Sequence, residues 1–166
     1  MILFYYVVMG CVAVLLQMVL LDPTSLVVWR PELPALWVVI AGWHMRDERV
    51  YVSTGVMVVF HSLFSEQPLG VSLVSYGVLA WFVLFQTQVF ERYAFLGTVM
   101  LGLMGTFVFM VVDYVGYSWV NQMWRWDVGL WNKILVPSVI NAVVAPLIGG
   151  ISQLIFSIRF KRDKEG

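Results

Sequence analysis

Four stretches of this chain are apolar over 20 residues or more, and they limit what it can fold into. They cover residues 2–21, 69–90, 94–117 and 134–158. A helix needs ~20 mainly apolar residues to cross the ~30 Å hydrocarbon core of a bilayer. Because unpaired backbone groups are costly in lipid, stretches of this length cross it as helices. The sequence therefore predicts an all-α integral membrane protein.

The composition agrees with this prediction. Hydrophobic residues make up 61% of the 166 residues and charged residues 12%, whereas an ordinary soluble domain has ~25% charged residues. The 10 basic and 10 acidic side chains are too few to cover the surface of a soluble domain of this size. Their net charge of zero gives no basic excess for a nucleic-acid partner. The single cysteine, Cys11, excludes an intramolecular disulfide and a cysteine-based metal site.

The number of crossings depends on two shorter stretches. Residues 31–45 and 50–64 are apolar but only 15 residues long each, which gives helices of ~22 Å. They could be two short helices, thinning the bilayer or shielded by neighbours, or one re-entrant hairpin around the hydrophilic turn at residues 46–49. We favour six helices over five or four, with the second and third short. Pro137 and Pro146 are expected to kink the last helix.

The basic residues predict the orientation. With the N-terminus in the cytoplasm, seven Lys and Arg lie on the inner side, and the outer side holds Arg30, Arg125 and Lys133. This bias follows the positive-inside rule and places both termini in the cytoplasm. The first apolar stretch is longer than that of a signal peptide, so we expect it to stay as the first helix. Residues 1–158 would then form one helical bundle, and residues 159–166 a basic cytoplasmic tail.

The sequence carries no motif for catalysis or nucleotide binding. Its two histidines, His44 and His61, are predicted on opposite sides of the membrane and could not share a metal ion. It contains no H-E-x-x-H motif, no G-x-S-x-G motif and no phosphate-binding G-x-x-x-x-G-K-[ST] loop. We therefore expect a protein that is not an enzyme and that has no catalytic residues, cofactor or metal site.

Isolated polar residues gather toward the predicted outer side. They are Arg30, Glu32, His61, Asp113 and Asn141. Charges in lipid are costly, so they usually pair or face an aqueous cavity. We hypothesise that Asp113 pairs with Arg30 across helices, with Asn141 or Glu32 nearby. Such a group would act either as a structural contact between helices or as an outward-facing pocket or docking site.

The predicted outer loop at residues 118–133 is rich in tryptophan. It holds Trp119, Trp124, Trp126 and Trp131. This density suits a segment lying on the outer leaflet, because the indole ring is apolar and its N–H needs a polar partner. The alternative is a docking surface for the periplasmic or juxtamembrane segment of a partner, because tryptophan is enriched in binding hot spots.

Small residues four apart mark places where helices can approach closely. They occur at Thr98 and Gly102, and again at Ala145 and Gly149. This spacing lets two helix backbones come together. We expect it to serve packing inside the bundle rather than homodimerisation.

Four segments with recognisable landmarks follow one another along the chain. RPELPALWVVI at residues 30–40 has the form of an R-P-[DE] start of a second helix, and RDERVYVSTGVMVVFHSLFSEQPLGVSLVSY at residues 46–76 that of a short third helix with an L-G turn. VFERYAFLG at residues 89–97 is a short inner turn, and VPSVINAVVAPLIGGI at residues 136–151 holds an N-A-x-x-x-P core. In this order they resemble the bacterial rod shape-determining membrane protein MreD family, over about residues 1–158.

The resemblance implies a non-enzymatic subunit of the cell-elongation machinery, a multi-pass protein of the bacterial inner membrane. Its partner would be the bitopic scaffold MreC, within an assembly that includes the actin-like MreB filament, the polymerase RodA and a class B penicillin-binding protein. The family fold also looks like the six-helix substrate-binding components of energy-coupling vitamin transporters. The family landmarks correspond here to Arg30, Pro31, Glu32, Leu69, Gly70, Asn141 and Pro146.

We therefore predict a membrane scaffold that holds a partner helix through small-residue packing and a few polar contacts. The tryptophan-rich loop would orient the partner outside the membrane. The alternative is the substrate-binding subunit of a vitamin-type transporter. That alternative requires a closed outer cavity lined by the loop tryptophans and Asn141, whereas a scaffold requires an exposed groove or shallow surface.

Overall fold

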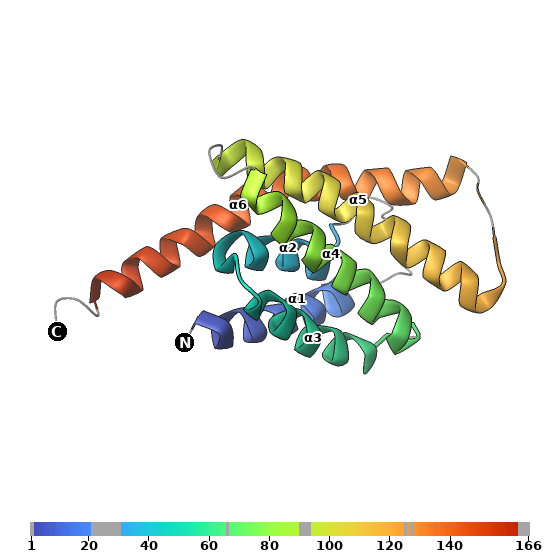
Figure 1. Ribbon diagram of the computed structural model, residues 1–166, viewed down its shortest axis with the longest axis horizontal. Helices are drawn as coiled ribbons and strands as arrows, with labels where there is room; N and C mark the ends of the chain where they lie inside the picture. Colours follow the sequence, from blue (N-terminus) through green and yellow to red (C-terminus); the bar gives the residue numbers. More distant parts are fainter. Residues whose placement is uncertain are drawn as a thin grey trace.

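The computed structural model describes residues 2–20, 31–65, 67–89, 94–124, 126 and 128–162. Six helices make up this part of the chain (Figure 1): α1 (Ile2–Leu20), α2 (Leu33–Met45), α3 (Arg49–Ser62), α4 (Leu69–Val89), α5 (Ala94–Asn121) and α6 (Val128–Arg162). These residues contain no strand. The prediction of an all-helical fold is confirmed for the described residues.

Four of the described helices are long and apolar enough to cross a membrane. Their apolar windows are Ile2–Val19, Leu69–Val89, Phe95–Asn121 and Val128–Leu154. They coincide with the four long stretches predicted from the sequence. The fold is therefore that of a multi-pass helical membrane protein.

The short helix α2 lies at the centre of the bundle. Every residue from Pro34 to Trp43 is buried, and the helix packs against the other five helices. A helix that is apolar on all sides belongs in a protein core. Its 13 residues reach only ~20 Å, and the longer helices around it shield its backbone from lipid. The neighbouring helices thus enclose α2, which is one of the arrangements that the sequence allowed for this short stretch.

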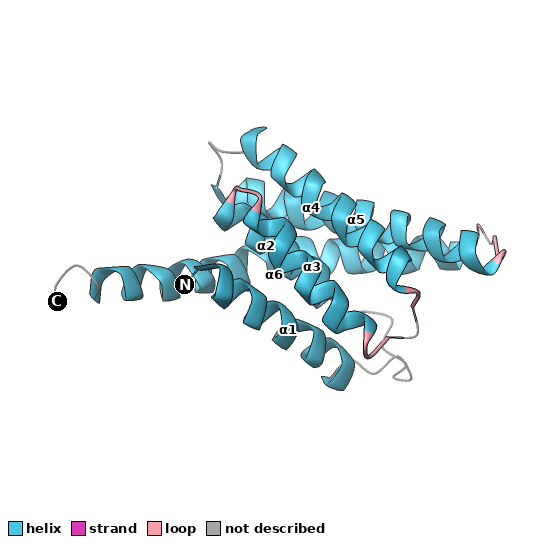
Figure 2. Ribbon diagram, turned by 60° about the horizontal axis from the view of Figure 1, so that its bottom comes forward, coloured by secondary structure: helices cyan, strands magenta, loops and turns pink. Residues whose placement is uncertain are grey.

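Successive helices run in opposite directions between the two ends of the bundle. Figures 1 and 2 place the start of α1, the turn between α2 and α3 and the last residues of α6 at one end, which we call the terminal end. The connection between α3 and α4 lies at the opposite end. There the end of α5 and the start of α6 project beyond the other helices, and we call this the hairpin end.

The prediction of a loop over residues 118–133 is wrong, because the segment between the two helices is shorter. Helix α5 continues to Asn121 and α6 already begins at Val128. The chain leaves α5 where Gln122 adopts a left-handed backbone with φ of 54°. Helices extend past their apolar stretches because a helix satisfies its own backbone groups, whereas a loop at the interface needs other partners. The last helix also bends along its length (Figure 1), and it contains both Pro137 and Pro146, as predicted.

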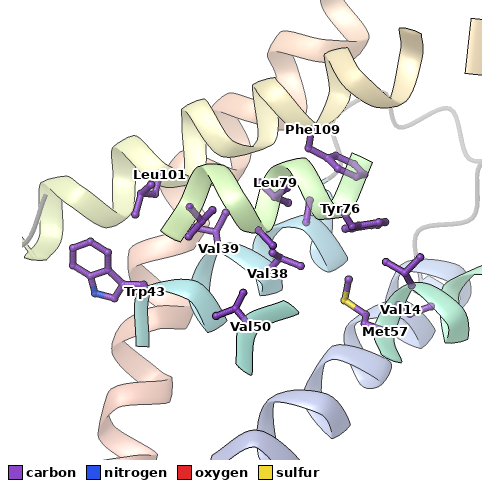
Figure 3. Close-up of a cluster of buried hydrophobic side chains, with 14 residues drawn as sticks. Val14, Val38, Val39, Trp43, Val50, Met57, Tyr76, Leu79, Leu101 and Phe109 are labelled. Carbon is purple, nitrogen blue, oxygen red and sulfur yellow. The ribbon is translucent and has the colours of Figure 1, made fainter. Parts of the chain in front are cut away.

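Helices α1, α2, α3, α4 and α5 all contribute side chains to the main hydrophobic core (Figure 3). Val39 of α2, Leu79 of α4 and Leu101 of α5 are almost fully buried within it. In Figure 3 the core runs from Trp43 and Leu101 at one side to Tyr76 and Phe109 at the other. A second cluster joins α1, α2 and α6. Together the two clusters hold α2 in place from all directions.

Helices α5 and α6 approach each other closely at their small residues. A Cβ atom added at Gly102 would lie 2.7 Å from the backbone oxygen of Asn141 and 2.9 Å from the Cβ of Ala145. One turn away, a Cβ at Gly149 would lie 3.7 Å from Thr98 Cγ2. The two small-residue pairs therefore face each other inside the bundle, as predicted.

Hydrogen bonds fix α1 against α2. The indole Nε1 of Trp37 donates to the backbone oxygen of Tyr6 at 2.9 Å. The amide oxygen of Gln17 accepts the backbone N–H of Leu33 at 3.0 Å. That N–H belongs to the first turn of α2, where it has no partner within its own helix. The lone amide of α1 thus completes the start of the central helix.

Candidate functional site

Asp113 lies on α5, in a polar group formed with the start of α4. Gln67 Nε2 donates to Asp113 Oδ2 at 2.8 Å, and Ser72 Oγ donates to Gln67 Oε1 at 3.3 Å. The second carboxylate oxygen, Oδ1, is buried and has no hydrogen-bond partner among the described residues. The predicted partner, Arg30, lies outside the described residues. The hydrogen-bond partner that the structure shows for this carboxylate is Gln67, a residue that the sequence did not single out.

Tyr76 lies beside this group and is almost fully buried. Its ring meets His61 at 5.9 Å in an edge-on arrangement and Phe109 at 4.5 Å, measured between ring centroids. Figure 3 shows Tyr76 and Phe109 side by side. The carboxyl groups of Glu32 and Asp113 are close enough to the Tyr76 hydroxyl to interact with it electrostatically. His61 Nδ1 is buried and has no hydrogen-bond partner among the described residues.

Asn141 ties α6 to two other helices. Its Nδ2 donates to Thr106 Oγ1 on α5 at 2.9 Å and to the backbone oxygen of Glu32, just before α2, at 3.2 Å. The side chains of Asn141 and Thr106 are fully buried. The remaining Oδ1 of Asn141 has no partner within the described part of the chain.

These groups form a polar layer on α3, α4, α5 and α6 and in the turns before α2 and α4, nearer the hairpin end. We define the polar layer as Glu32, His61, Gln67, Tyr76, Thr106, Asp113 and Asn141. Buried polar atoms usually have hydrogen-bond partners. Here two side-chain oxygens and a ring nitrogen are left open among the described residues. The two oxygens are able to accept a hydrogen bond from a further donor, and the ring nitrogen donates or accepts according to its tautomer.

The structure brings together only some of the predicted site residues. Glu32, Asp113 and Asn141 belong to the polar layer. Leu69 and Gly70 form the first turn of α4 and are exposed. Pro31 precedes α2, and Pro146 is a half-buried residue of α6, so they too lie outside the layer. Arg30 lies outside the described residues.

The four predicted docking tryptophans are all exposed at the hairpin end. Trp119 has 76% of its surface exposed and Trp126 has 54%. Trp126 packs edge-on against Tyr114 at 5.3 Å and lies 6.3 Å from Trp131. We call Trp119, Trp124, Trp126 and Trp131 the tryptophan surface. Because Asn141 is fully buried, it does not share a cavity with these exposed rings.

Sequence reasoning missed Gln67, Tyr76 and Thr106. A usable signal existed for Thr106, which is seven residues before Asp113 and therefore on the same face of α5. Gln67 and Tyr76 gave no such signal, because their roles depend on how the turn before α4 folds back. No pattern in the sequence specifies that turn.

Two cavities lined by described residues lie apart from the polar layer. One, of about 420 Å³, lies at the turn between α2 and α3, and the other, of about 120 Å³, is an apolar space between α1, α2 and α6. Within the described residues, no group of three or more His, Cys, Asp or Glu could hold a metal ion.

Fold and site together define a multi-pass helical membrane protein with a buried polar layer and an exposed tryptophan surface. Comparison of the chain with family models, with characterised proteins and with solved structures found no match.

Proposed function

We propose that this protein is a non-enzymatic scaffold subunit of the bacterial cell-elongation machinery, similar to the MreD family. In this proposal it is an inner-membrane protein that crosses the membrane six times, with both termini in the cytoplasm. Its partner is a bitopic scaffold of the MreC type, within the wider assembly of MreB, RodA and a class B penicillin-binding protein. The ordered sequence motifs support the family, and the bias of basic residues supports the orientation.

The observation that carries the proposal is the tryptophan surface on a projecting hairpin. Helix α5 has 28 residues and α6 has 35, so they reach ~42 and ~52 Å, well beyond the ~30 Å hydrocarbon core. The exposed tryptophans lie at the end of α5, at the start of α6 and between them, and this is the part of the two helices that projects past the rest of the bundle (Figures 1 and 2). Exposed tryptophans beside a membrane surface are suited to hold the juxtamembrane segment of a partner.

The polar layer supplies the second element of the proposal. Hydrogen bonds between helices stabilise their association in a membrane. Asp113 is half-buried, and in this proposal its side chain turns outward so that Oδ1, which is buried in the free bundle, accepts a donor from the partner helix. A polar contact of this kind fixes the depth and rotation of a helix that apolar packing alone leaves free to slide.

The transporter alternative receives less support. A vitamin-binding subunit would need Asn141 and the tryptophans around one closed cavity. Asn141 is instead used between α2, α5 and α6, and the tryptophans are exposed. The scaffold interpretation agrees with both the buried contacts of Asn141 and the exposure of the tryptophans.

The test is capture of the tagged full chain from native membranes in mild detergent, followed by mass spectrometry. We expect an MreC-type bitopic protein together with other elongation proteins. The double variant Trp124→Ser/Trp126→Ser should reduce capture about 30-fold, the effect of losing a hot spot of ~2 kcal/mol. Asp113→Asn should also weaken capture, because it removes the charge that strengthens the hydrogen bond to the partner.

Trp81→Ser is the matched control, because Trp81 is 59% exposed on α4, away from the hairpin end. It should capture the partner as the unmodified chain does. Recovery of ABC-type ATPase subunits, or of a tightly held small molecule with no scaffold, would contradict the proposal. If Asp113→Asn folds and captures normally, the proposed contact at Asp113 is wrong.

A further inference from the structure

Three buried polar atoms without a hydrogen-bond partner lie around the connection between α3 and α4. They are His61 Nδ1, Ser65 Oγ and Asp113 Oδ1, and each is open with respect to the described residues. His61 and Ser65 belong to one turn, in which the backbone oxygen of His61 accepts the N–H of Ser65 at 3.0 Å. Gln67, two residues further on, donates to Asp113. Open buried atoms of this kind mark the place of an ordered water or an ion.

The Asp113 carboxylate carries a charge that its described neighbours do not balance. Its Oδ2 accepts a hydrogen bond from the Gln67 amide, and the Ser75 hydroxyl also lies close to the carboxylate. Both of these groups are neutral, and no Lys or Arg among the described residues forms an ion pair with Asp113. A buried charge is costly unless it is paired or binds a metal ion. The carboxylate therefore needs either a proton or a cation.

The surroundings of the carboxylate favour the cation, because they offer several oxygen atoms. Ser65 Oγ is open, and the hydroxyls of Ser75 and Tyr76 belong to side chains that are almost fully buried. The Tyr76 hydroxyl is close enough to Asp113 to interact with it electrostatically. Oxygen ligands of this kind suit hard cations. A cation is held by several of these oxygens at once, whereas a proton on Oδ1 is shared with one acceptor only.

The charge of the site favours a monovalent ion. Glu32, the other acid near Tyr76, has a partner of its own, which leaves the single carboxylate of Asp113 to match one positive charge. Calcium sites usually draw on several carboxylates. Transition metals prefer nitrogen and sulfur ligands, and the described residues hold no group of three or more His, Cys, Asp or Glu that could bind one. The expectation from the sequence, no metal site, concerns histidine and cysteine ligands, which this site does not use.

The site lies close to the surface at the hairpin end. Ser65, Gln67 and Asp113 are each half-buried, and the connection between α3 and α4 lies at this end of the bundle (Figures 1 and 2). An ion can therefore reach the carboxylate from the aqueous side without crossing the hydrocarbon core.

We propose that the free bundle binds one monovalent alkali cation between Asp113 Oδ1 and Ser65 Oγ, with the hydroxyls of Ser75 and Tyr76 as further ligands. The ion balances the carboxylate while that side chain is turned inward. When the side chain turns outward to a partner, the ion loses its charged ligand. Binding of the cation is a property of the chain alone, so it does not depend on the proposed scaffold role.

The test is equilibrium binding of radioactive Na⁺, and in a parallel sample of Rb⁺ in place of K⁺, to the purified full chain in mild detergent. Choline chloride keeps the ionic strength constant. We expect saturable binding of one Na⁺ or one Rb⁺ per chain, which the unlabelled ion displaces and choline does not. Asp113→Asn should abolish this binding, because a neutral amide leaves the ion without a counter-charge. Ser65→Ala should weaken it about tenfold, the loss of one ligand to a charged group.

Asp47→Asn and Ser62→Ala are the matched controls. Asp47 is a carboxylate at the terminal end that already pairs with Arg49, and Ser62 Oγ already donates to a backbone oxygen of its own helix. Both variants should bind the ion as the unmodified chain does. Ser65 Oγ has no described hydrogen bond to lose, so Ser65→Ala decides the question even if Asp113→Asn fails to fold.

Four results would overturn the proposal. They are no saturable binding of either ion, stronger displacement by Ca²⁺ than by the unlabelled alkali ion, unchanged binding in Ser65→Ala or in a folded Asp113→Asn, and an equal loss in Asp47→Asn. Because the purified chain contains no partner, none of these results depends on whether the scaffold is captured from membranes.

Discussion

Replacing Gly102 by leucine should prevent α5 and α6 from packing, whereas the same change at Gly150 should leave the bundle intact. A Cβ at Gly102 already lies 2.7 Å from the backbone oxygen of Asn141, and a backbone atom cannot turn aside as a side chain does. The helices must separate, which also breaks the bond between Asn141 and Thr106. Overpacking costs about 1–3 kcal/mol, and more where the neighbour is rigid.

Gly150 provides a matched control on the exposed side of α6, because a Cβ there meets nothing within 4 Å. Thermal unfolding in detergent, followed by far-ultraviolet circular dichroism, measures both variants. Gly102→Leu should give little monodisperse protein or a strongly lowered Tm, and Gly150→Leu a Tm close to the original. Similar Tm values for the two variants would show that α5 and α6 do not approach at Gly102.

Replacing Trp37 by alanine should lower the free energy of unfolding by about 3–5 kcal/mol. The side chain is only 6% exposed, and its ring packs on Tyr5 and Tyr6. Its Nε1 also donates across to α1. Removal leaves a cavity in the second hydrophobic cluster, and the packing contacts on its walls are lost.

Trp37→Phe separates the two contributions, since it keeps most of the ring packing and removes the hydrogen bond. Trp81→Ala is the control for the loss of an indole ring at an exposed site. Equilibrium unfolding by sodium dodecyl sulfate, read from far-ultraviolet circular dichroism, gives the free energies. An equal loss in Trp37→Ala and Trp81→Ala would be at odds with the central place of α2.

The helices themselves could be predicted because long apolar stretches mark them directly. The ends of α1 and α4 lie within one residue of the predicted ends at residues 21 and 90. The ends of α5 and α6 were misplaced, because the tryptophan-rich segment has the polarity of a loop although much of it is helical. Hydropathy measures solubility in lipid, and it does not show where a helix that leaves the membrane ends.

The polar layer could be predicted only in part of its membership, and not in its contacts. Glu32, Asp113 and Asn141 stood out because polar groups are rare in apolar helices. Their partners depend on which faces of the helices meet, and helices that are apolar on every side carry little information about that. The sequence therefore did not predict that Gln67, in a turn, donates a hydrogen bond to Asp113, or that Thr106 accepts one from Asn141.

The most direct test of the proposed scaffold role is photo-crosslinking in intact membranes. A photoreactive phenylalanine derivative replaces Trp124, and in a second sample Trp81, and the adducts are identified by mass spectrometry. The account predicts an adduct with a bitopic protein of the MreC type at position 124 and none at position 81. An adduct at position 124 with lipid or a second copy of this chain alone, or the same protein adduct at both positions, would contradict it.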